Sequence, residues 1–249
     1  MMLGKLKKRF LFGLIFCFIS PFVYQYSPYK IEFLGHYDKV FAHRVNSTEK
    51  LQSALHYFDG IELDLVYHKN KNLLDVNHPP TNSIHLNFRS YFEEIPKSKT
   101  PFIWLDIKNL TQENSQEILA LLLSIFKERS YPMNKVLIES KDPTSLPIFK
   151  ESGFLISYYL PYRLSTKQDS IIQSEVISIK KVLKQYPNMG ISASYEDYSL
   201  LNKHFKKQDK YLWVITSFMD RSISEIRTIL KDESVKIVLS KFKSFNGNR

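Results

Sequence analysis

The sequence predicts an α/β protein, specifically a TIM-type (β/α)8 barrel, from three observations. Eight short apolar segments rich in β-branched and aromatic residues recur after residue 38. They alternate with helical patterns, which is the arrangement of β and α units that builds a parallel sheet. The few polar residues in the apolar segments gather near the C-terminal ends, where a closed barrel places its active site.

The eight expected strands cover residues 39–43, 60–66, 101–107, 135–140, 154–160, 189–194, 211–217 and 235–240. Apart from their last residues these segments are apolar on both faces, as expected when helices cover the outside of a sheet. A doubly wound open sheet would use the same kind of strand. However, the chain has no glycine-rich phosphate-binding loop, so we favour the barrel.

Helices are expected between the strands. Asn46 or Ser47 is positioned to cap a helix that continues to Phe58. Residues 112–130 have strong helical periodicity, and residues 222–234 are expected to form the helix before the last strand. Pro143 falls where the first turn of a helix tolerates proline.

Composition limits the classes of partner. The chain has 249 residues, 43% of them hydrophobic, and a formal net charge of +10. A basic surface favours anionic partners such as phosphate esters or acidic membranes. We find no nucleic-acid-binding motif and no basic helix with interleaved aromatic residues, so a nucleic-acid partner is not expected.

The first thirty residues differ from the rest and are expected to be a signal peptide or membrane anchor, with residues 31–249 forming the barrel domain. A basic start is followed by an almost wholly apolar run over residues 10–24. No small-residue cleavage site follows, so we favour a retained anchor helix over a removed signal peptide. The basic end stays inside, so the barrel is expected on the extracytoplasmic side of the membrane, or secreted if the segment is cleaved.

Two histidines and three carboxylates make residues 40–106 the most informative part of the chain. His43 ends the first expected strand, and His78 follows the second strand after a turn. Glu62 and Asp64 share one face of the second strand because strand side chains alternate, and Asp106 lies late in the third strand. Neighbouring carboxylates resist burial unless a positive group lies between them. The pattern predicts a divalent cation held by oxygen ligands, with histidines beside it to move protons.

The motifs AHRVNS, IELDL, NHPP and LDIKN together resemble the phospholipase-C-like phosphodiesterase superfamily, which includes glycerophosphodiester phosphodiesterases, sphingomyelinase D-type enzymes and the menorin family. The combination is most similar to the menorin pattern, which shares the Val-Asn-Ser run and the doubled proline. Glycerophosphodiester phosphodiesterases usually have glutamate at the position of Asp106, aspartate at that of Pro79 and Thr-Asp in place of Ser240-Lys241. The resemblance is specific over residues 38–110.

The resemblance implies which residues hold the cation and which transfer protons. Glu62, Asp64 and Asp106 are expected to bind Mg²⁺ or Ca²⁺, both of which prefer oxygen ligands. His43 and His78 are expected to act as general base and general acid, in an order that the motifs leave open.

Five further residues are expected to contact substrate. Arg44 and Lys108 would hold the phosphate. Arg44 would do so through bidentate hydrogen bonds from its guanidinium, and Lys108 as a point charge. Asn46 would donate a hydrogen bond to phosphate or to cation-bound water, unless it is the helix cap. Glu139 would bind substrate or a lysine, and Trp213 would line the pocket for a lipid or headgroup, unless it belongs to the core.

These residues predict a metal-dependent phosphodiesterase that hydrolyses glycerophosphodiester or lysophospholipid-like substrates, with the two histidines as acid and base. The alternative is a menorin-like recognition or adhesion domain that keeps the barrel without catalysis. Retention of three carboxylates and two histidines favours the enzyme, because a non-catalytic domain need not keep them.

Overall fold

A closed β-barrel forms the centre of the computed structural model of the protein, which describes residues 23–214 and 223–244. The strands of the described residues are β1 (Val40–Ala42), β2 (Gly60–His68), β3 (Leu73–Val76), β4 (Phe102–Ile107), β5 (Val136–Ser140), β6 (Leu155–Tyr159), β7 (Gly190–Ser194), β8 (Lys210–Val214) and β9 (Val235–Ser240). All of them except β3 correspond to expected strands.

Eight of these described strands run parallel and close into a ring. Neighbours pair in the order β1-β9-β8-β7-β6-β5-β4-β2, and β1 pairs with β2 to complete the circle. β3 pairs antiparallel with the C-terminal part of β2, with Leu65 opposite Val76. The predicted (β/α)8 barrel is therefore confirmed, and β3 is an additional hairpin strand that we did not expect.

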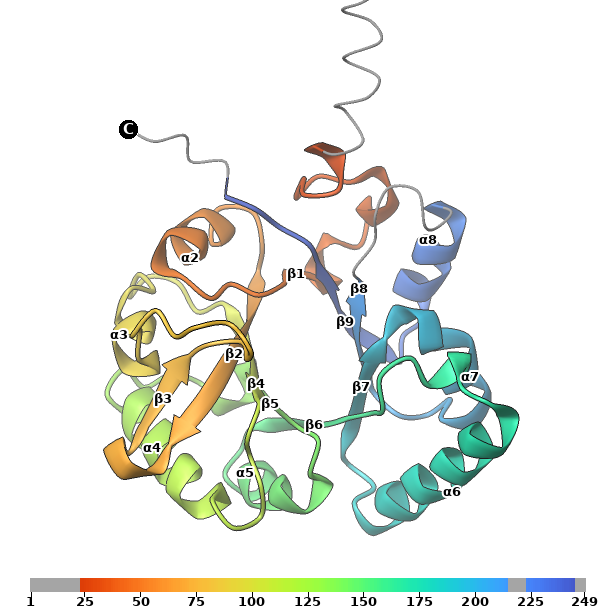
Figure 1. Cartoon of the computed structure of the whole chain (residues 1–249). Helices are drawn as coiled ribbons and strands as arrows, with labels where there is room; N and C mark the ends of the chain where they lie inside the picture. The colour runs from red at the N-terminus through yellow and green to blue at the C-terminus, as the bar shows by residue number, and fades with distance from the viewer. Residues whose placement is uncertain (1–22, 215–222, 245–249) are drawn as a thin grey trace, which may run out of the picture.

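Helices surround the ring (Figure 1). In the described residues they are α2 (Thr48–Ala54), α3 (Phe88–Glu93), α4 (Ser115–Lys127), α5 (Pro147–Glu151), α6 (Asp169–Gln185), α7 (Tyr198–His204) and α8 (Ile223–Lys231). Short 3₁₀ turns occur at Ile31–Phe33, Tyr37–Lys39, Lys69–Lys71, Met133–Lys135, Pro143–Ser145, Leu164–Thr166 and Tyr195–Asp197. α4 buries Ile118, Leu122 and Ile125, so its apolar stripe faces the strands.

The boundaries of α2 (Thr48–Ala54) settle which residue caps it and correct its expected length. The hydroxyl of Ser47 accepts a hydrogen bond of 3.2 Å from the backbone N–H of Lys50, so Ser47 rather than Asn46 caps α2. α2 ends at Ala54, and the expected continuation to Phe58 is wrong. The ring of Phe58 instead packs edge-on against Phe242, which follows β9.

Large side chains fill the interior of the barrel below its C-terminal rim. The buried cluster inside the ring consists of Phe41, Trp104, Leu137, Tyr211, Trp213, Ile237 and Leu239. Gly60 makes room for one of these rings, because a Cβ atom there would lie 2.5 Å from the Phe41 ring. The barrel floor is therefore closed, and an interior polar group can meet solvent only at the C-terminal rim.

The segment before β1 packs on the outside of the barrel between α2 and α8 (Figure 1). The guanidinium of Arg227 in α8 donates to the carbonyl of Leu34 at 3.0 Å. The ammonium of Lys30, a residue only 2% exposed, donates to the hydroxyl of Ser240 at 3.0 Å. Residues from Lys30 onward thus belong to the packed structure.

The predicted anchor helix falls mostly on residues 10–22, which lie outside the described residues. Within the described part of the chain, no helix combines the length and apolar character needed to cross a bilayer. The expected strand over 211–217 is confirmed through Val214, and its last residues likewise lie outside the described range.

Candidate active site

Neighbouring parallel strands bring four carboxylates to one end of the barrel. Asp64 of β2 lies directly opposite Asp106 of β4, and Asp106 lies opposite Glu139 of β5. Glu62 is two residues before Asp64 and points to the same face. Adjacent strands lie about 4.8 Å apart, so side chains in register on the same face are neighbours. The period of two in β2 and the register of β4 therefore build the acidic group.

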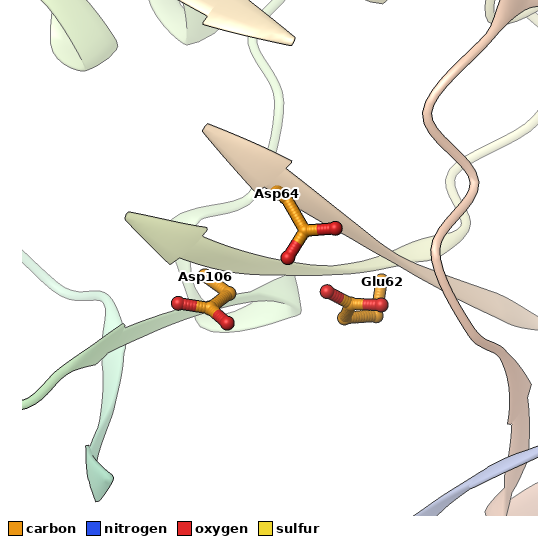
Figure 2. Close-up of side chains that lie close together, drawn as sticks. All are labelled: Glu62, Asp64 and Asp106. Atoms are coloured by element: carbon orange, nitrogen blue, oxygen red, sulfur yellow. The ribbon is translucent and has the colours of Figure 1, made fainter. Parts of the chain in front are cut away.

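Glu62, Asp64 and Asp106 form a compact cluster, shown in Figure 2. One carboxylate oxygen from each lies within 4.8 Å of the others. Glu62 and Asp64 are buried, and the side chain of Asp106 is 13% exposed. Burial raises the pKa of Glu62 well above its usual range, and the carboxylates of Asp64 and Asp106 raise it further.

Lys108 supplies the positive charge in this cluster. Its ammonium lies 2.5 Å from Oδ1 of Asp64 and is also paired with Asp106. Burial alone lowers the pKa of Lys108, but the carboxylates of Asp106 and Asp64 outweigh it and raise the pKa. One ammonium is thus paired with two of the three clustered carboxyl groups.

This donor set fits a hard divalent cation. The three groups that approach one another are all carboxylates, with no thiolate or imidazole among them, as Mg²⁺ and Ca²⁺ prefer. Buried carboxylates at this separation repel one another strongly at low effective dielectric constant. A divalent cation would remove that repulsion, and Glu62, Asp64 and Asp106 are the residues that would hold it.

The loop after β1 carries His43 and Arg44 to the cluster. The strand ends at Ala42, so His43 lies one residue beyond it, contrary to our expectation that it ends the strand. The backbone N–H of His43 donates to the carbonyl of Ser240 at 3.0 Å. The backbone N–H of Arg44 donates to a carboxylate oxygen of Glu62 at 2.6 Å. The loop is thereby fixed to both β9 and β2.

Both histidines lie at the site. Nε2 of His43 is 3.7 Å from the carboxylate of Glu62, and Nε2 of His78 is 2.9 Å from the guanidinium of Arg44. Burial and then the Arg44 charge lower the pKa of His43 to about 3. Burial also lowers the pKa of His78. Because arginine can only donate, Nε2 of His78 is the acceptor in that contact.

Asn46 belongs to the site rather than to the helix terminus. Its amide nitrogen donates to Oδ2 of Asp64 at 2.7 Å, and its amide oxygen accepts from the backbone N–H of Asp64 at 3.0 Å. The two bonds fix the direction of the Asp64 carboxylate. Asn46 therefore orients a member of the acidic cluster, while Ser47 caps α2.

Glu139 is oriented separately from the cluster. The indole N–H of Trp104 donates to one of its carboxylate oxygens at 3.0 Å, and the hydroxyl of Ser192 donates to the other. Burial raises the pKa of Glu139, and the nearby Asp106 raises it further. Two lone-pair positions of the carboxylate remain free of these donors, so Glu139 can still accept from a ligand.

A cavity of about 80 Å³ is lined by all of the predicted site residues except Asn46. Its lining includes both histidines, Arg44, Lys108, all four carboxylates, Trp213, and two tyrosines, Tyr159 and Tyr162. The rings of Tyr159 and Trp213 lie 4.9 Å apart, and Tyr162 is exposed at the rim. Part of the cavity lining is thus aromatic.

Sequence reasoning could not tell which tyrosines line the cavity and which pack elsewhere. Tyr158, Tyr159 and Tyr162 have similar sequence context, yet Tyr158 packs into the outer core while the other two line the cavity. Successive side chains of β6 point to opposite faces, so Tyr158 and Tyr159 must differ in direction. The sequence does not say which of the two points into the barrel. Lys50, which contacts the loop carbonyls of His43 and Arg44, had no sequence signal.

No protein-family model and no curated protein matches the chain. Among solved structures, a phosphodiesterase from Oleispira antarctica, in complex with the product sn-glycerol-3-phosphate, is 13% identical, with a TM-score of 0.56 over 81% of this chain and 92% of that one. A glycerophosphodiester phosphodiesterase from Parabacteroides distasonis is 15% identical, with a TM-score of 0.55 over 81% of this chain and 91% of that one. A third, from Thermotoga maritima, is 17% identical, with a TM-score of 0.53 over 80% and 92% of the two chains.

These likenesses span most of both chains in each pair. At such low identity they bear on architecture, and they agree with the strand order and closure described above. The protein therefore has the (β/α)8 barrel fold that is also found in these phosphodiesterases.

Proposed function

We propose that the protein is a divalent-cation-dependent phosphodiesterase that acts on glycerophosphodiester or lysophospholipid-like substrates. The observation that supports this most is the convergence of three carboxylates within 4.8 Å beside two histidines, an arginine and a lysine in one cavity. The similar fold of phosphodiesterases, one of them bound to sn-glycerol-3-phosphate, also supports the proposal.

In this proposal, cationic groups bind and orient the phosphate. The guanidinium of Arg44 can donate two parallel hydrogen bonds to phosphate oxygens, and Lys108 adds a point charge. A cation held by Glu62, Asp64 and Asp106 would polarise the phosphoryl oxygens and offset developing negative charge. The aromatic wall at Tyr159 and Trp213 would contact the alcohol portion of the substrate.

His43 and His78 would transfer the protons. The attacking hydroxyl belongs either to water or to the substrate itself. One imidazole accepts its proton as the new P–O bond forms. The other donates a proton to the alcohol oxygen as the ester P–O bond breaks. The acid must be protonated beforehand, and the negative phosphate would raise the pKa of an imidazole beside it.

The membrane location also remains a proposal. The apolar run over residues 10–24 would hold the chain at a bilayer, with the barrel on the extracytoplasmic side, or would be removed to release a secreted protein. Either arrangement would bring the site to lipid-derived phosphodiesters.

The test is hydrolysis of glycerophosphocholine and a lysophospholipid by the purified protein, with Mg²⁺, with Ca²⁺ and with chelator. We expect turnover only with a cation. His43→Ala should lower kcat by roughly 10²- to 10⁴-fold because it removes a proton-transfer group. His204→Ala, at the end of α7 and outside the cavity, is the matched control and should keep full activity. Absence of turnover on a broad phosphodiester panel with either cation would favour the recognition-domain alternative.

A further inference from the structure

We propose that Lys50 is a positioning residue, which holds the backbone of His43 and Arg44 in the conformation that the site requires. Its ammonium donates to the carbonyl of His43 at 2.8 Å and to the carbonyl of Arg44 at 2.7 Å. These bonds connect Lys50 to the loop and not to the three clustered carboxylates. Lys50 therefore acts on the site through the loop. Its effect on catalysis rests on the proposed function, whereas its effect on the loop does not.

Lys50 is itself held in place by α2. It lies in the first turn of the helix, and its backbone N–H donates to the capping hydroxyl of Ser47. The side chain therefore extends from a fixed point back to the loop that precedes the helix. A lysine ammonium has three donors, and two of them are used on consecutive carbonyls.

The loop needs this support because Arg44 has an unfavourable backbone conformation. Its φ is +53°, in the left-handed region that residues with a Cβ atom rarely occupy. Such a conformation persists where the contacts around the residue hold it in place. The bonds from Lys50 to the carbonyls of His43 and Arg44 flank this residue and are such contacts.

The conformation of Arg44 serves two site contacts at once. Its backbone N–H donates to Glu62 at 2.6 Å, which orients one of the three clustered carboxylates. Its guanidinium reaches Nε2 of His78 at 2.9 Å, which brings the phosphate-binding group beside a proton-transfer group. If Arg44 left the left-handed region, its N–H would turn away from Glu62 and its side chain would leave His78.

A lysine bound to carbonyls can also merely stabilise the fold, and Lys39 offers a control for that role. The ammonium of Lys39 donates to the carbonyls of Leu230 and Asp232 at 3.0 and 2.9 Å. Lys39 precedes β1 and therefore lies at the opposite end of the barrel from the carboxylate cluster. Lys39→Met and Lys50→Met thus each remove two bonds from an ammonium to backbone carbonyls, at opposite ends of the barrel.

The first experiment compares Lys50→Met, Lys50→Arg and Lys39→Met with the unaltered protein. Urea unfolding gives stability, titration with Mg²⁺ and Ca²⁺ gives the cation Kd, and kinetics give kcat and KM. We expect Lys50→Met to weaken cation binding several-fold and to lower kcat/KM by at least tenfold, with a raised KM. Lys50→Arg keeps the donors and should recover part of both losses. Lys39→Met should lose stability without a change in Kd, kcat or KM.

The second experiment reads the loop directly, whether or not the protein turns over a phosphodiester. Crystal structures of the unaltered protein and of Lys50→Met give the φ of Arg44 and the distance from its nitrogen to Glu62. We expect φ to leave the left-handed region and the Glu62 contact to be lost in Lys50→Met. An unchanged Arg44 conformation in Lys50→Met would overturn the proposal, as would parallel effects of Lys50→Met and Lys39→Met on cation affinity.

Discussion

Two consecutive residues have separate roles at the start of α2: Asn46 orients the carboxylate of Asp64, and Ser47 caps the helix. Asparagine and serine are both common helix caps, and the chain presents them consecutively at positions 46 and 47. Only the structure shows that Ser47 caps α2 while Asn46 binds Asp64. The carboxylates were easier to predict, because the alternation of β2 alone places Glu62 and Asp64 on one face. The left-handed φ of Arg44 had no signal, since arginine rarely adopts it.

Lys30 allows a prediction of pH dependence that is independent of the site. Burial lowers its pKa to about 8 from the ordinary 10.5. Between these values the unfolded chain binds a proton that the folded chain has released, so the free energy of unfolding should rise with pH over this range. Relative to Lys30→Met, the unaltered protein should gain on the order of 3 kcal/mol from pH 8 to 10.5. Urea unfolding of both proteins at several pH values tests this, and parallel curves would show that the ammonium is not desolvated.

At the scale of elements, the barrel strands were predictable, whereas the hairpin strand β3 and the end of α2 were not. Apart from their last residues, the eight expected barrel strands are apolar on both faces, and this pattern can be recognised in single segments of five to seven residues. β3 was missed because Leu73–Val76 follows a polar turn and pairs with the end of β2 rather than with the barrel ring. α2 is shorter than predicted because Phe58 packs against Phe242, a contact with the other end of the chain.

Gly60, at the start of β2, has no room for a side chain. A Cβ atom at Gly60 would lie 2.5–2.8 Å from three atoms of the Phe41 ring, and that ring is buried inside the barrel. Gly60→Ala should therefore lower the free energy of unfolding by about 1–3 kcal/mol, as overpacking typically does. Urea unfolding provides the measurement. A variant as stable as the unaltered protein would mean that the Phe41 ring has room to move.

At the scale of the whole molecule, closure of the barrel brings distant residues into one cavity. His43 from the first βα loop, Asp106 from β4 and Trp213 from β8 line the same space. The sequence could predict that these residues lie late in their strands, and the barrel rule then predicts that they meet. It could not predict that Trp104 and Ser192 donate to the Glu139 carboxylate and fix its orientation.

Cation binding by the intact barrel is the most direct test of the candidate site. Thermal unfolding should be followed in chelator and in millimolar Mg²⁺ or Ca²⁺ for the unaltered protein, Asp64→Asn and Glu139→Gln. A ligand that binds only the folded state stabilises it, by about 2.7 kcal/mol at a concentration of 100 Kd. We predict that Mg²⁺ or Ca²⁺ raises the Tm of the unaltered protein and of Glu139→Gln but not that of Asp64→Asn. Equal Tm values in chelator and in both cations for the unaltered protein would contradict a cation site at Glu62, Asp64 and Asp106.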